Sequence, residues 1–252
     1  MNNNNQYDII MPIGNDQDIT ILSINSALKQ TLPYKKFIFI IDTKTDNEAN
    51  KIKNKIKHVE RSIIIKTNRI GQGAARQAGI EAASSEFIAF LDSDDIWHPK
   101  KIELQLNQLL KDKADFSFCS YKAIDISNKL LLFNVHCKKR ISLLDLLFSC
   151  PIGTSTVLCK KKIFNHNLMF SNSRKRCDYI TWFKIWRDLK PKHSVFSDYA
   201  VLIIKHSNSI SSSYWTSTSG YFSMMNAFKV LGFLPFFSYI YAFFYSLFQI
   251  IV

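Results

Sequence analysis

The chain has 252 residues, of which 47% are hydrophobic, and this is ample for the core of one large domain with or without a C-terminal extension. Its five cysteines show neither CxxC spacing nor the density of small secreted domains, which argues against a disulfide framework or a zinc site. The formal net charge of +13 requires either an anionic partner or a broadly solvated basic surface.

The first half of the chain alternates short apolar runs with helical patterns. We predict strands over residues 8–11, 37–41, 62–65, 87–91 and 116–119, and helices over residues 47–57, 73–83 and 99–110. A further helix follows the first strand, with Asp18 as its cap and with Ile21, Ile24 and Leu28 on one face. Because the strands are apolar almost throughout, the pattern predicts an α/β fold, with a mostly parallel sheet covered by helices on both faces.

Polar residues follow three of these predicted strands. Asn15 follows the first strand, Asp42 ends the second, and Asp92-Ser93-Asp94-Asp95 ends the strand at residues 87–91. In open α/β sheets, ligands bind outside the carboxyl ends of the strands, so we expect a ligand site at this edge.

The acidic stretch itself allows two interpretations. In extended backbone Asp92 and Asp94 point the same way, and two carboxylates that repel each other favour a divalent cation with oxygen ligands. The alternative is that Asp94 or Asp95 merely caps the helix that begins near Pro99.

The pattern is less regular after residue 121. We predict a short helix over residues 142–148 with Ser142 as its cap, a strand over 155–159, a buried helix over 178–189 and a last strand over 199–204. Residues 208–219 are Ser-rich and are interpreted as a linker.

Several blocks of residues carry a family resemblance. They are Pro12-Ile13-Gly14-Asn15; Ser26, Leu28, Gln30 and Thr31; Asp42-Thr43-Lys44-Thr45-Asp46; Asn68, Gly71, Ala75, Arg76 and Gly79, followed by Phe87–Trp97; and Gly153-Thr154-Ser155, followed by Arg176–Trp182. On these blocks the chain resembles the bacterial family 2 glycosyltransferases, which are inverting enzymes with the Rossmann-like GT-A fold. Ile13 and Gly14 depart from the family pattern, and Cys177 stands where the family usually has Glu or Gln.

The resemblance implies a domain over residues 1–207, with a nucleotide-binding half at about 7–121 and an acceptor half at about 122–207. It implies that the nucleotide-sugar donor is bound by Pro12, Ile13, Gly14, Asn15, Asp42, Asn68, Gly71, Arg76, Asp92 and Ser93. It also implies that Asp94, assisted by Asp92, holds Mn²⁺ or Mg²⁺. A turn-forming role for Asp42 and a surface salt bridge for Arg76 are the structural alternatives.

The resemblance also points to the catalytic group. Asp178 is implied as the base that removes the proton of the acceptor hydroxyl, and a plain N-cap is its structural alternative. On the acceptor side we include Thr154, Cys177 and Trp182; Trp182 follows Asp178 by one helical turn, so it could stack on a sugar or simply pack in the core.

The end of the chain indicates membrane association. Residues 230–252 carry no charge and are rich in aromatic residues, so we expect residues 220–252 to form a hydrophobic helical tail that dips into a bilayer or, less readily, spans it. The basic clusters favour an anionic membrane surface over nucleic acid, for which no binding motif is present. With no signal peptide at the N-terminus, we expect the enzyme at the cytoplasmic face of the bacterial inner membrane, with a polyprenyl-diphosphate-linked acceptor used in O-antigen, capsule or exopolysaccharide synthesis.

Two other classes of function stay open at this point. One is a sugar-phosphate nucleotidyltransferase. Enzymes of that class typically have a Gly-x-Gly-x-Arg loop after the first strand, and this chain lacks it. The other is a non-catalytic nucleotide-sugar-binding membrane scaffold, and the presence of Asp42, Asp92, Asp94 and Asp178 argues against it.

Overall fold

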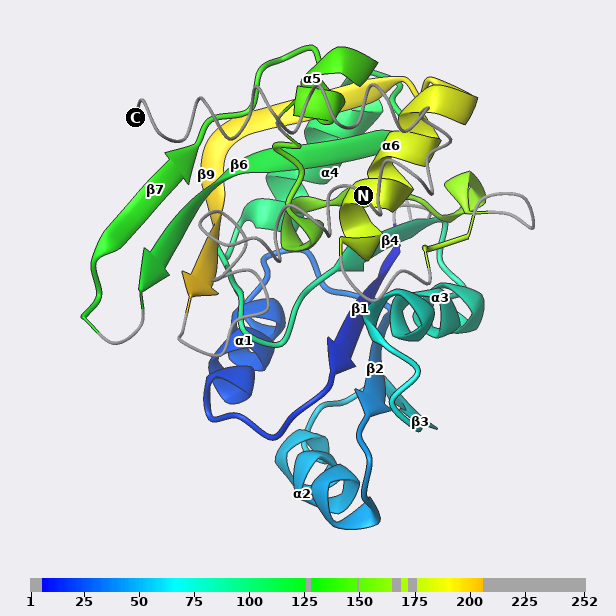
Figure 1. Cartoon of the computed structure of the whole chain (residues 1–252), viewed down its shortest axis with the longest axis vertical. Coiled ribbons are helices and arrows are strands. Elements are labelled where there is room, and N and C mark those ends of the chain that lie inside the picture. Colours follow the sequence, from blue (N-terminus) through cyan, green and yellow to red (C-terminus); the bar gives the residue numbers. More distant parts are fainter. Residues whose placement is uncertain (1–5, 126–127, 149, 165–168, 172–175, 206–252) are drawn as a thin grey trace, which may run out of the picture.

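The described part of the chain forms one mixed sheet flanked by helices (Figure 1). The computed structural model describes residues 6–125, 128–148, 150–164, 169–171 and 176–205. Its strands are β1 (Tyr7–Ile13), β2 (Lys36–Asp42), β3 (Ser62–Thr67), β4 (Phe87–Phe90), β5 (Ile96–Trp97), β6 (Phe116–Asp125), β7 (Leu131–Val135), β8 (Leu158–Lys160) and β9 (His193–Lys205).

The helices agree closely with the predicted ranges. They are α1 (Ile19–Leu28), α2 (Asp46–Ile56), α3 (Gln72–Ala82), α4 (Lys101–Lys111), α5 (Leu143–Phe148) and α6 (Cys177–Leu189), with short 3₁₀ turns at Thr154–Thr156 and Lys161–Ile163. Ser142 caps α5 as expected, because its hydroxyl accepts a hydrogen bond from the Asp145 amide while the Asp145 carboxylate accepts one from the Ser142 amide.

The sheet is mixed instead of mostly parallel: its first half and the long β6–β9 pair are parallel, and the other strand pairs are antiparallel. The strand order is β3-β2-β1-β4-β8-β6-β9-β5, with β7 paired to β6. The four strands from β3 to β4 are parallel, whereas β8 runs antiparallel to both β4 and β6. The chain enters β8 beside the carboxyl end of β4, with Leu158 opposite Ala89, and runs back to Lys160 opposite Phe87.

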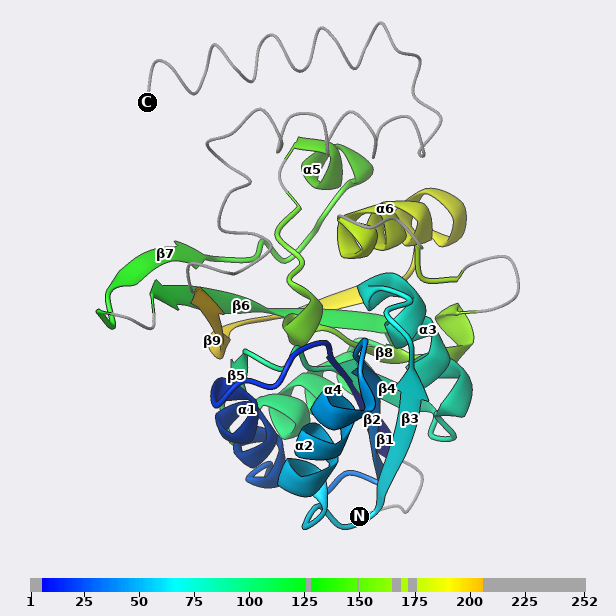
Figure 2. The same cartoon turned by 60° about the horizontal axis from the view of Figure 1, so that its bottom comes forward.

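Two hydrophobic cores lie on opposite faces of this sheet. Alternate residues of β1 point to opposite sides: Ile10 belongs to the core that contains residues of α3 and α6, and Ile9 belongs to the core under α1, α2 and α4. Figure 2 shows α3 on one side of the parallel strands and α1, α2 and α4 on the other. The approach of α3 is close, since a Cβ atom on Gly79 would lie 2.5 Å from Cγ2 of Ile10.

Several local predictions are wrong. Asp18 makes no side-chain cap for α1, and of the expected face only Ile24 is buried, while Ile21 and Leu28 are each 37% exposed. Residues 155 and 156 belong to a 3₁₀ turn instead of a strand. The sequence pattern does not predict the short strands β5 and β7. The two residues of β5 pair with β9, which is distant in sequence, and the residues of β7 are exposed on both faces.

The predicted linker at 208–219 and the predicted tail at 220–252 lie outside the described residues. Among the residues that are described, none of the helices has both the length and the apolar character that crossing a bilayer requires. The predicted division between a donor half and an acceptor half at residue 121 falls inside β6, so the two halves share one sheet.

A buried lysine at the start of α4 leads to a first prediction. Lys101 is fully buried, its Nζ has no hydrogen-bond partner among the described residues, and burial lowers its pKa from 10.5 to about 8. Its ammonium group lies 4.4 Å from the centre of the Trp97 ring.

We expect Lys101→Met to raise the free energy of unfolding by about 3 kcal/mol at pH 7, at about 1.4 kcal/mol per pKa unit. The folded state loses the Lys101 proton near pH 8, and the unfolded state loses it only near pH 10.5. The wild type therefore gains stability as the pH rises between these values, and the difference in unfolding free energy between variant and wild type shrinks. Urea unfolding of the wild type and the variant at pH 7 and pH 10 measures this difference in free energy. The same difference at both pH values would contradict the prediction.

Candidate active site

The acidic stretch after β4 is held by one hydroxyl group from the other half of the sheet. The Oγ of Ser155 accepts a hydrogen bond from the Asp92 amide at 3.0 Å and donates one to the Asp95 carboxylate at 2.5 Å. The second oxygen of Asp95 accepts from the Ile204 amide at 3.3 Å. The loop is therefore tied both to the 3₁₀ turn before β8 and to the end of β9.

Asp95 serves as an internal structural carboxylate and not as a helix cap. It is 3% exposed, and burial raises its pKa well above the ordinary value, with a further increase from the negative charges of Asp94 and Asp92. The first turn of α4 has no side-chain cap from its own N-cap residue; instead the Gln30 side chain accepts a hydrogen bond from the Ile102 amide at 3.0 Å. The capping interpretation of Asp95 is thus wrong.

Asp92 forms an ion pair with Arg76. One guanidinium nitrogen of Arg76 lies 2.5 Å from Asp92, and the arginine is only 2% exposed, so this is a buried ion pair and not the surface salt bridge. Burial lowers the pKa of Arg76, but the negative charge of Asp92 and the further acidic group of Asp178 raise it by more. Arg76 is therefore a permanent cation between the acidic loop and the start of α6.

Asp94 lies between Asp92 and Asp95 in the chain and is half-buried, as is Asp92. Within the described ranges no group of three or more His, Cys, Asp or Glu side chains is arranged to hold a metal. Mg²⁺ commonly binds through one or two carboxylates together with substrate phosphates, so a carboxylate pair of Asp94 and Asp92 fits such an ion only when a diphosphate completes the site.

Asp178 is the second residue of α6, where the helix dipole favours a negative charge. The N-cap position belongs to Arg176, so the capping alternative for Asp178 is wrong. The hydroxyl of Thr154 donates a hydrogen bond to the Asp178 carboxylate at 3.3 Å. Because Thr154 and Ser155 are adjacent, a single turn of the chain positions both Asp178 and the acidic loop.

Asp42 fixes a second loop at the same edge of the sheet. Its carboxylate accepts hydrogen bonds from the Thr67 hydroxyl and from the amides of Ile70 and Gly71, at 2.7–2.9 Å. Gly71 has φ of 93°, a conformation that favours glycine. These partners lie 25–29 residues away, so Asp42 is not a local turn residue. The hydrogen bond to a nucleotide base stays a prediction.

The remaining donor-side residues surround this loop. Pro12 and Ile13 are the last residues of β1, and Ile13 is fully buried in the core, so only its backbone can meet a nucleotide. Gly14, Asn15 and Asn68 are exposed. An Arg69 guanidinium nitrogen lies 3.5 Å from the Asn15 side-chain oxygen, which connects the two loops.

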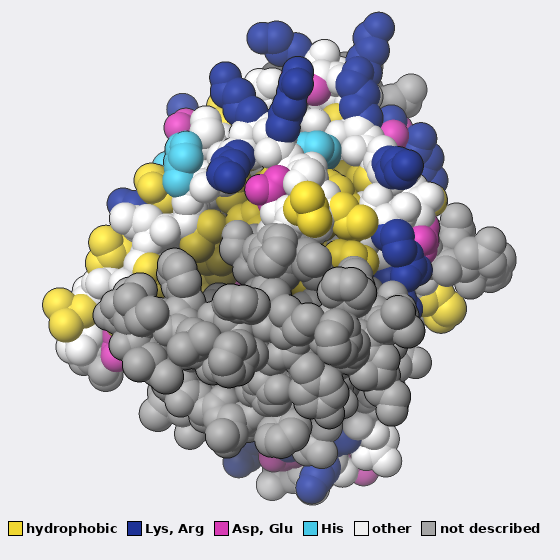
Figure 3. Space-filling view, turned by 45° about the horizontal axis from the view of Figure 1, so that its top comes forward, with side chains coloured by type: hydrophobic (Ala, Val, Ile, Leu, Met, Phe, Trp, Pro, Cys, Tyr) yellow, Lys and Arg dark blue, Asp and Glu magenta, His cyan; other side chains and the backbone are white. Residues whose placement is uncertain are grey.

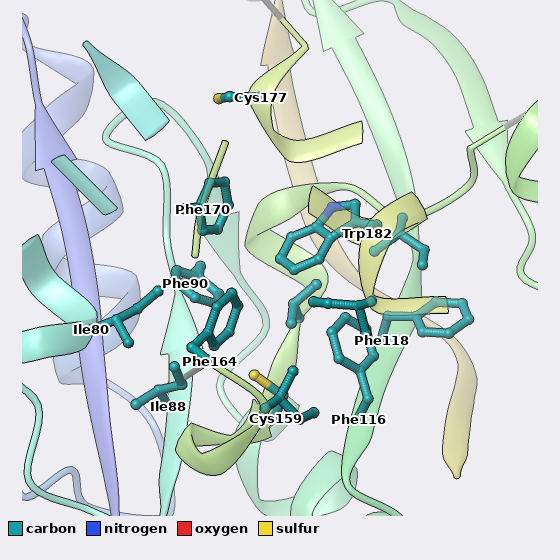
Figure 4. Packing of buried hydrophobic residues seen from close by; sticks show 14 of the residues in the cluster. Ile80, Ile88, Phe90, Phe116, Phe118, Cys159, Phe164, Phe170, Cys177 and Trp182 are labelled. Carbon is teal, nitrogen blue, oxygen red and sulfur yellow. The ribbon is translucent and has the colours of Figure 1, made fainter. Parts of the chain in front are cut away.

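The structure corrects the acceptor-side expectation for Trp182. Its indole ring is fully buried and packs against Phe90, Phe116 and Phe170, with ring centres 5.4–6.1 Å apart (Figure 4). It presents no face to an acceptor sugar, because α6 turns this side of the helix toward the core.

Cys177 is also buried, and its thiol accepts a hydrogen bond from Arg76 at 3.5 Å. Burial raises the pKa of this thiol to about 11, although Arg76 lowers it, so the group is neutral at pH 7. The thiol contacts one terminal nitrogen of the Arg76 guanidinium group, and Asp92 pairs with the other.

Sequence reasoning missed the role of Ser155. Thr154, Ser155 and Thr156 were interpreted as an acceptor-side residue and the start of a strand. A run of three hydroxyl residues directly after a glycine is a signal for a turn with local side-chain hydrogen bonds, and the Thr156 hydroxyl does donate to the Gly153 carbonyl at 2.6 Å.

The ion pair at Arg76 gives a prediction for stability. We expect Arg76→Met to destabilise the fold by about 2–3 kcal/mol, below the full value of a buried pair because Asp92 is 30% exposed. A double-mutant cycle with Asp92→Asn, read by urea unfolding, isolates the pair. The double variant should lose much less than the sum of the single variants; simple additivity would show that the two side chains do not interact.

The comparisons with known proteins agree with this arrangement. Residues 8–164 match the family model described as "Glycosyl transferase family 2". A UDP-Glc:alpha-D-GlcNAc-diphosphoundecaprenol beta-1,3-glucosyltransferase from Escherichia coli, WfgD, is 34% identical over 71% of this chain and 69% of its own length. A second E. coli protein with the same described activity, WfaP, is 33% identical over 70% of this chain and 68% of its own length.

Solved structures show the same fold. The crystal structure of S. aureus TarS 1-349 in complex with UDP-GlcNAc has a TM-score of 0.67 and 21% identity, and the match covers 88% of this chain and 65% of that one. At this identity the likeness concerns the fold, which is the mixed α/β fold of GT-A type. From the family match and the two E. coli relatives together, this chain is a glycosyltransferase and belongs to glycosyl transferase family 2.

Proposed function

We propose that this enzyme transfers a sugar, with inversion, from a nucleoside-diphosphate donor to a hydroxyl group of a lipid-linked saccharide. The observation that carries the proposal is the Thr154–Ser155 turn, which brings Asp178 and the acidic loop to the same edge of the sheet. Both E. coli relatives are described as using UDP-Glc and a GlcNAc-diphosphoundecaprenol acceptor, which favours glucose and that class of acceptor here.

The base in this proposal is Asp178. Its carboxylate lies in the N-terminal turn of α6 and accepts a hydrogen bond from the Thr154 hydroxyl. There it would accept the proton of the acceptor hydroxyl as that oxygen attacks the anomeric carbon. The bond from that carbon to the diphosphate breaks on the opposite face, so one displacement inverts the configuration.

The leaving diphosphate would meet the acidic loop. Asp94, with Asp92 beside it, would hold Mn²⁺ or Mg²⁺ through carboxylate oxygens. When bound, such an ion neutralises negative charge on the departing nucleoside diphosphate. Arg76 orients Asp92 through their ion pair, and Ser155 and the Ile204 amide keep Asp95 turned away from the ligand.

We place this activity at the cytoplasmic face of the bacterial inner membrane, in the assembly of a surface polysaccharide such as O-antigen, capsule or exopolysaccharide. A polyprenyl-diphosphate acceptor remains in the membrane, so the enzyme must meet it at the surface. The uncharged residues 230–252 and the basic surface support association with an anionic bilayer.

The two alternatives are less well supported. A sugar-phosphate nucleotidyltransferase is disfavoured by the family to which the chain belongs. A non-catalytic scaffold would not need Asp178 to be held by Thr154.

The role of Asp178 is tested by Asp178→Asn. We expect turnover to fall by about 10²–10⁴-fold because the base is lost, while UDP-glucose binding stays within twofold. The control is Asp198→Asn at an exposed position of β9, which should keep full activity. Transfer is measured on a GlcNAc-diphosphate lipid, with the anomeric product read by NMR. Full turnover by Asp178→Asn would refute the assignment.

The role of Asp94 is tested by metal removal. UDP binding by the wild type should weaken at least about tenfold when Mn²⁺ and Mg²⁺ are removed with EDTA, because the diphosphate loses its counter-charge. Asp94→Asn should bind UDP weakly with or without metal, whereas Asp198→Asn, at an exposed position, should behave as the wild type. Calorimetric UDP titrations that show no metal dependence in the wild type would exclude the ion.

A further inference from the structure

A hollow of about 330 Å³ lies at the end of α6 that is remote from Asp178. Its lining residues are Ile141, Leu143, Trp186, Arg187, Lys190, Pro191 and His193. The hollow is rigidly built, because the Trp186 indole donates a hydrogen bond to the Ile141 carbonyl at 3.2 Å and the Ile141 amide donates to His193 at 3.2 Å. Its floor is apolar, and its rim carries cations.

Cations are concentrated around this hollow. Exposed basic residues precede α5 and follow α6: Lys138, Lys139, Arg140, Lys190 and Lys192. The acidic residues of these two segments are already paired, Asp145 with Lys138 and Asp188 with Arg187. No ion pair within the described ranges involves Lys139, Arg140, Lys190 or Lys192. The positive charge of this face is therefore not neutralised by its own carboxylates.

Exposed leucines stand among these cations. Leu144 on α5 is 64% exposed, Leu143 beside it is 36% exposed, and Leu189 at the end of α6 is 43% exposed. Figure 3, which brings the top of the molecule forward, shows Lys and Arg side chains gathered around hydrophobic ones on the described part of this face. Leucines within a ring of cations are typical of surfaces that lie in the interface of an anionic bilayer.

We propose that this face, formed by residues 138–144 and 186–192, is the surface by which the enzyme docks on an anionic lipid bilayer. The lysines and Arg140 would meet lipid phosphates, and Leu143 and Leu144 would enter the boundary between headgroups and acyl chains. This inference rests on the proposed function, because a lipid-linked acceptor must be reached from the membrane.

The position of the face suits that acceptor. Asp178 and Arg187 lie on the same helix, about 14 Å apart along its axis at about 1.5 Å per residue. Docking at the far end of α6 would hold Asp178 at about this distance from the bilayer, on the side to which the headgroup sugar of a lipid-linked acceptor projects.

Charge decides between a bilayer and a second copy of this chain as the occupant. The chain carries +13 overall, and two copies that met through this face would bring their unneutralised cations together. An anionic bilayer offers the opposite charge, and each Lys or Arg near its surface contributes to binding.

The test measures binding of the full chain to vesicles by co-sedimentation. Lys139→Glu/Arg140→Glu should lower the partition onto phosphatidylglycerol/phosphatidylethanolamine vesicles at least about tenfold, and Leu143→Ser/Leu144→Ser should lower it as well. The matched controls are Lys51→Glu/Lys57→Glu on the distant α2 segment and Leu104→Ser on α4, all exposed positions. Residues 230–252 are present in every variant, so differences between variants report on this face alone.

Wild-type binding should weaken with salt and be low on phosphatidylcholine vesicles. Transfer to a vesicle-embedded acceptor should fall in the docking variants, while transfer to a short-chain, water-soluble GlcNAc diphosphate stays at the wild-type level. The proposal is overturned if the docking variants bind vesicles as well as the controls do. It is also overturned if these variants lose a dimer that the wild type forms, as seen by analytical ultracentrifugation, without losing vesicle binding. Failure of the wild type to use either acceptor would instead overturn the proposed function.

Discussion

The hydroxyl group of Ser155 joins the two halves of this enzyme at the point where the chemistry is expected. It accepts a hydrogen bond from the Asp92 amide and donates one to the Asp95 carboxylate. The adjacent residue, Thr154, donates a hydrogen bond to the Asp178 carboxylate. The same turn is also held by the Trp97 indole, which donates a hydrogen bond to the Ser155 carbonyl at 2.8 Å, and by the Gln105 side chain, which donates one to the Thr156 carbonyl at 2.9 Å. The position of Asp178 relative to the acidic loop therefore depends on this short turn.

The same contact explains how three neighbouring aspartates coexist. Unpaired carboxylates this close together repel one another and are costly to bury. The fold separates their environments: Asp92 is paired with Arg76, Asp95 is buried against hydrogen-bond donors, and Asp94 is half-buried between them. Arg76 is buried against Cys177, so its guanidinium group also links this loop to the start of α6. The Arg76 guanidinium group and the Ser155 hydroxyl thus stabilise three aspartates whose negative charges would otherwise repel one another.

Helix α6 connects three features that are distant in sequence from the acidic loop. Its first turn carries Asp178, its middle packs Trp182 and Trp186 against the aromatic core, and its last turn borders the hollow beside α5. The buried tryptophans fix the helix as a spacer between Asp178 and the basic face. Such a spacer fits the proposed function, in which a membrane-bound acceptor would meet a soluble donor.

The sequence by itself determined the alternation of strands and helices, the polar residues at three strand ends and the family, because these follow from local periodicity and from motifs read in order. It also allowed Asp42, Arg76 and Asp178 to be singled out. Only the tertiary structure decided what each residue does, since the deciding partners lie far apart in the chain: Asp92 meets Arg76 across 16 positions, and Asp95 meets Ile204 across 109. The burial of Trp182 and the reversed direction of β8 likewise depend on packing between distant elements, which no local pattern encodes.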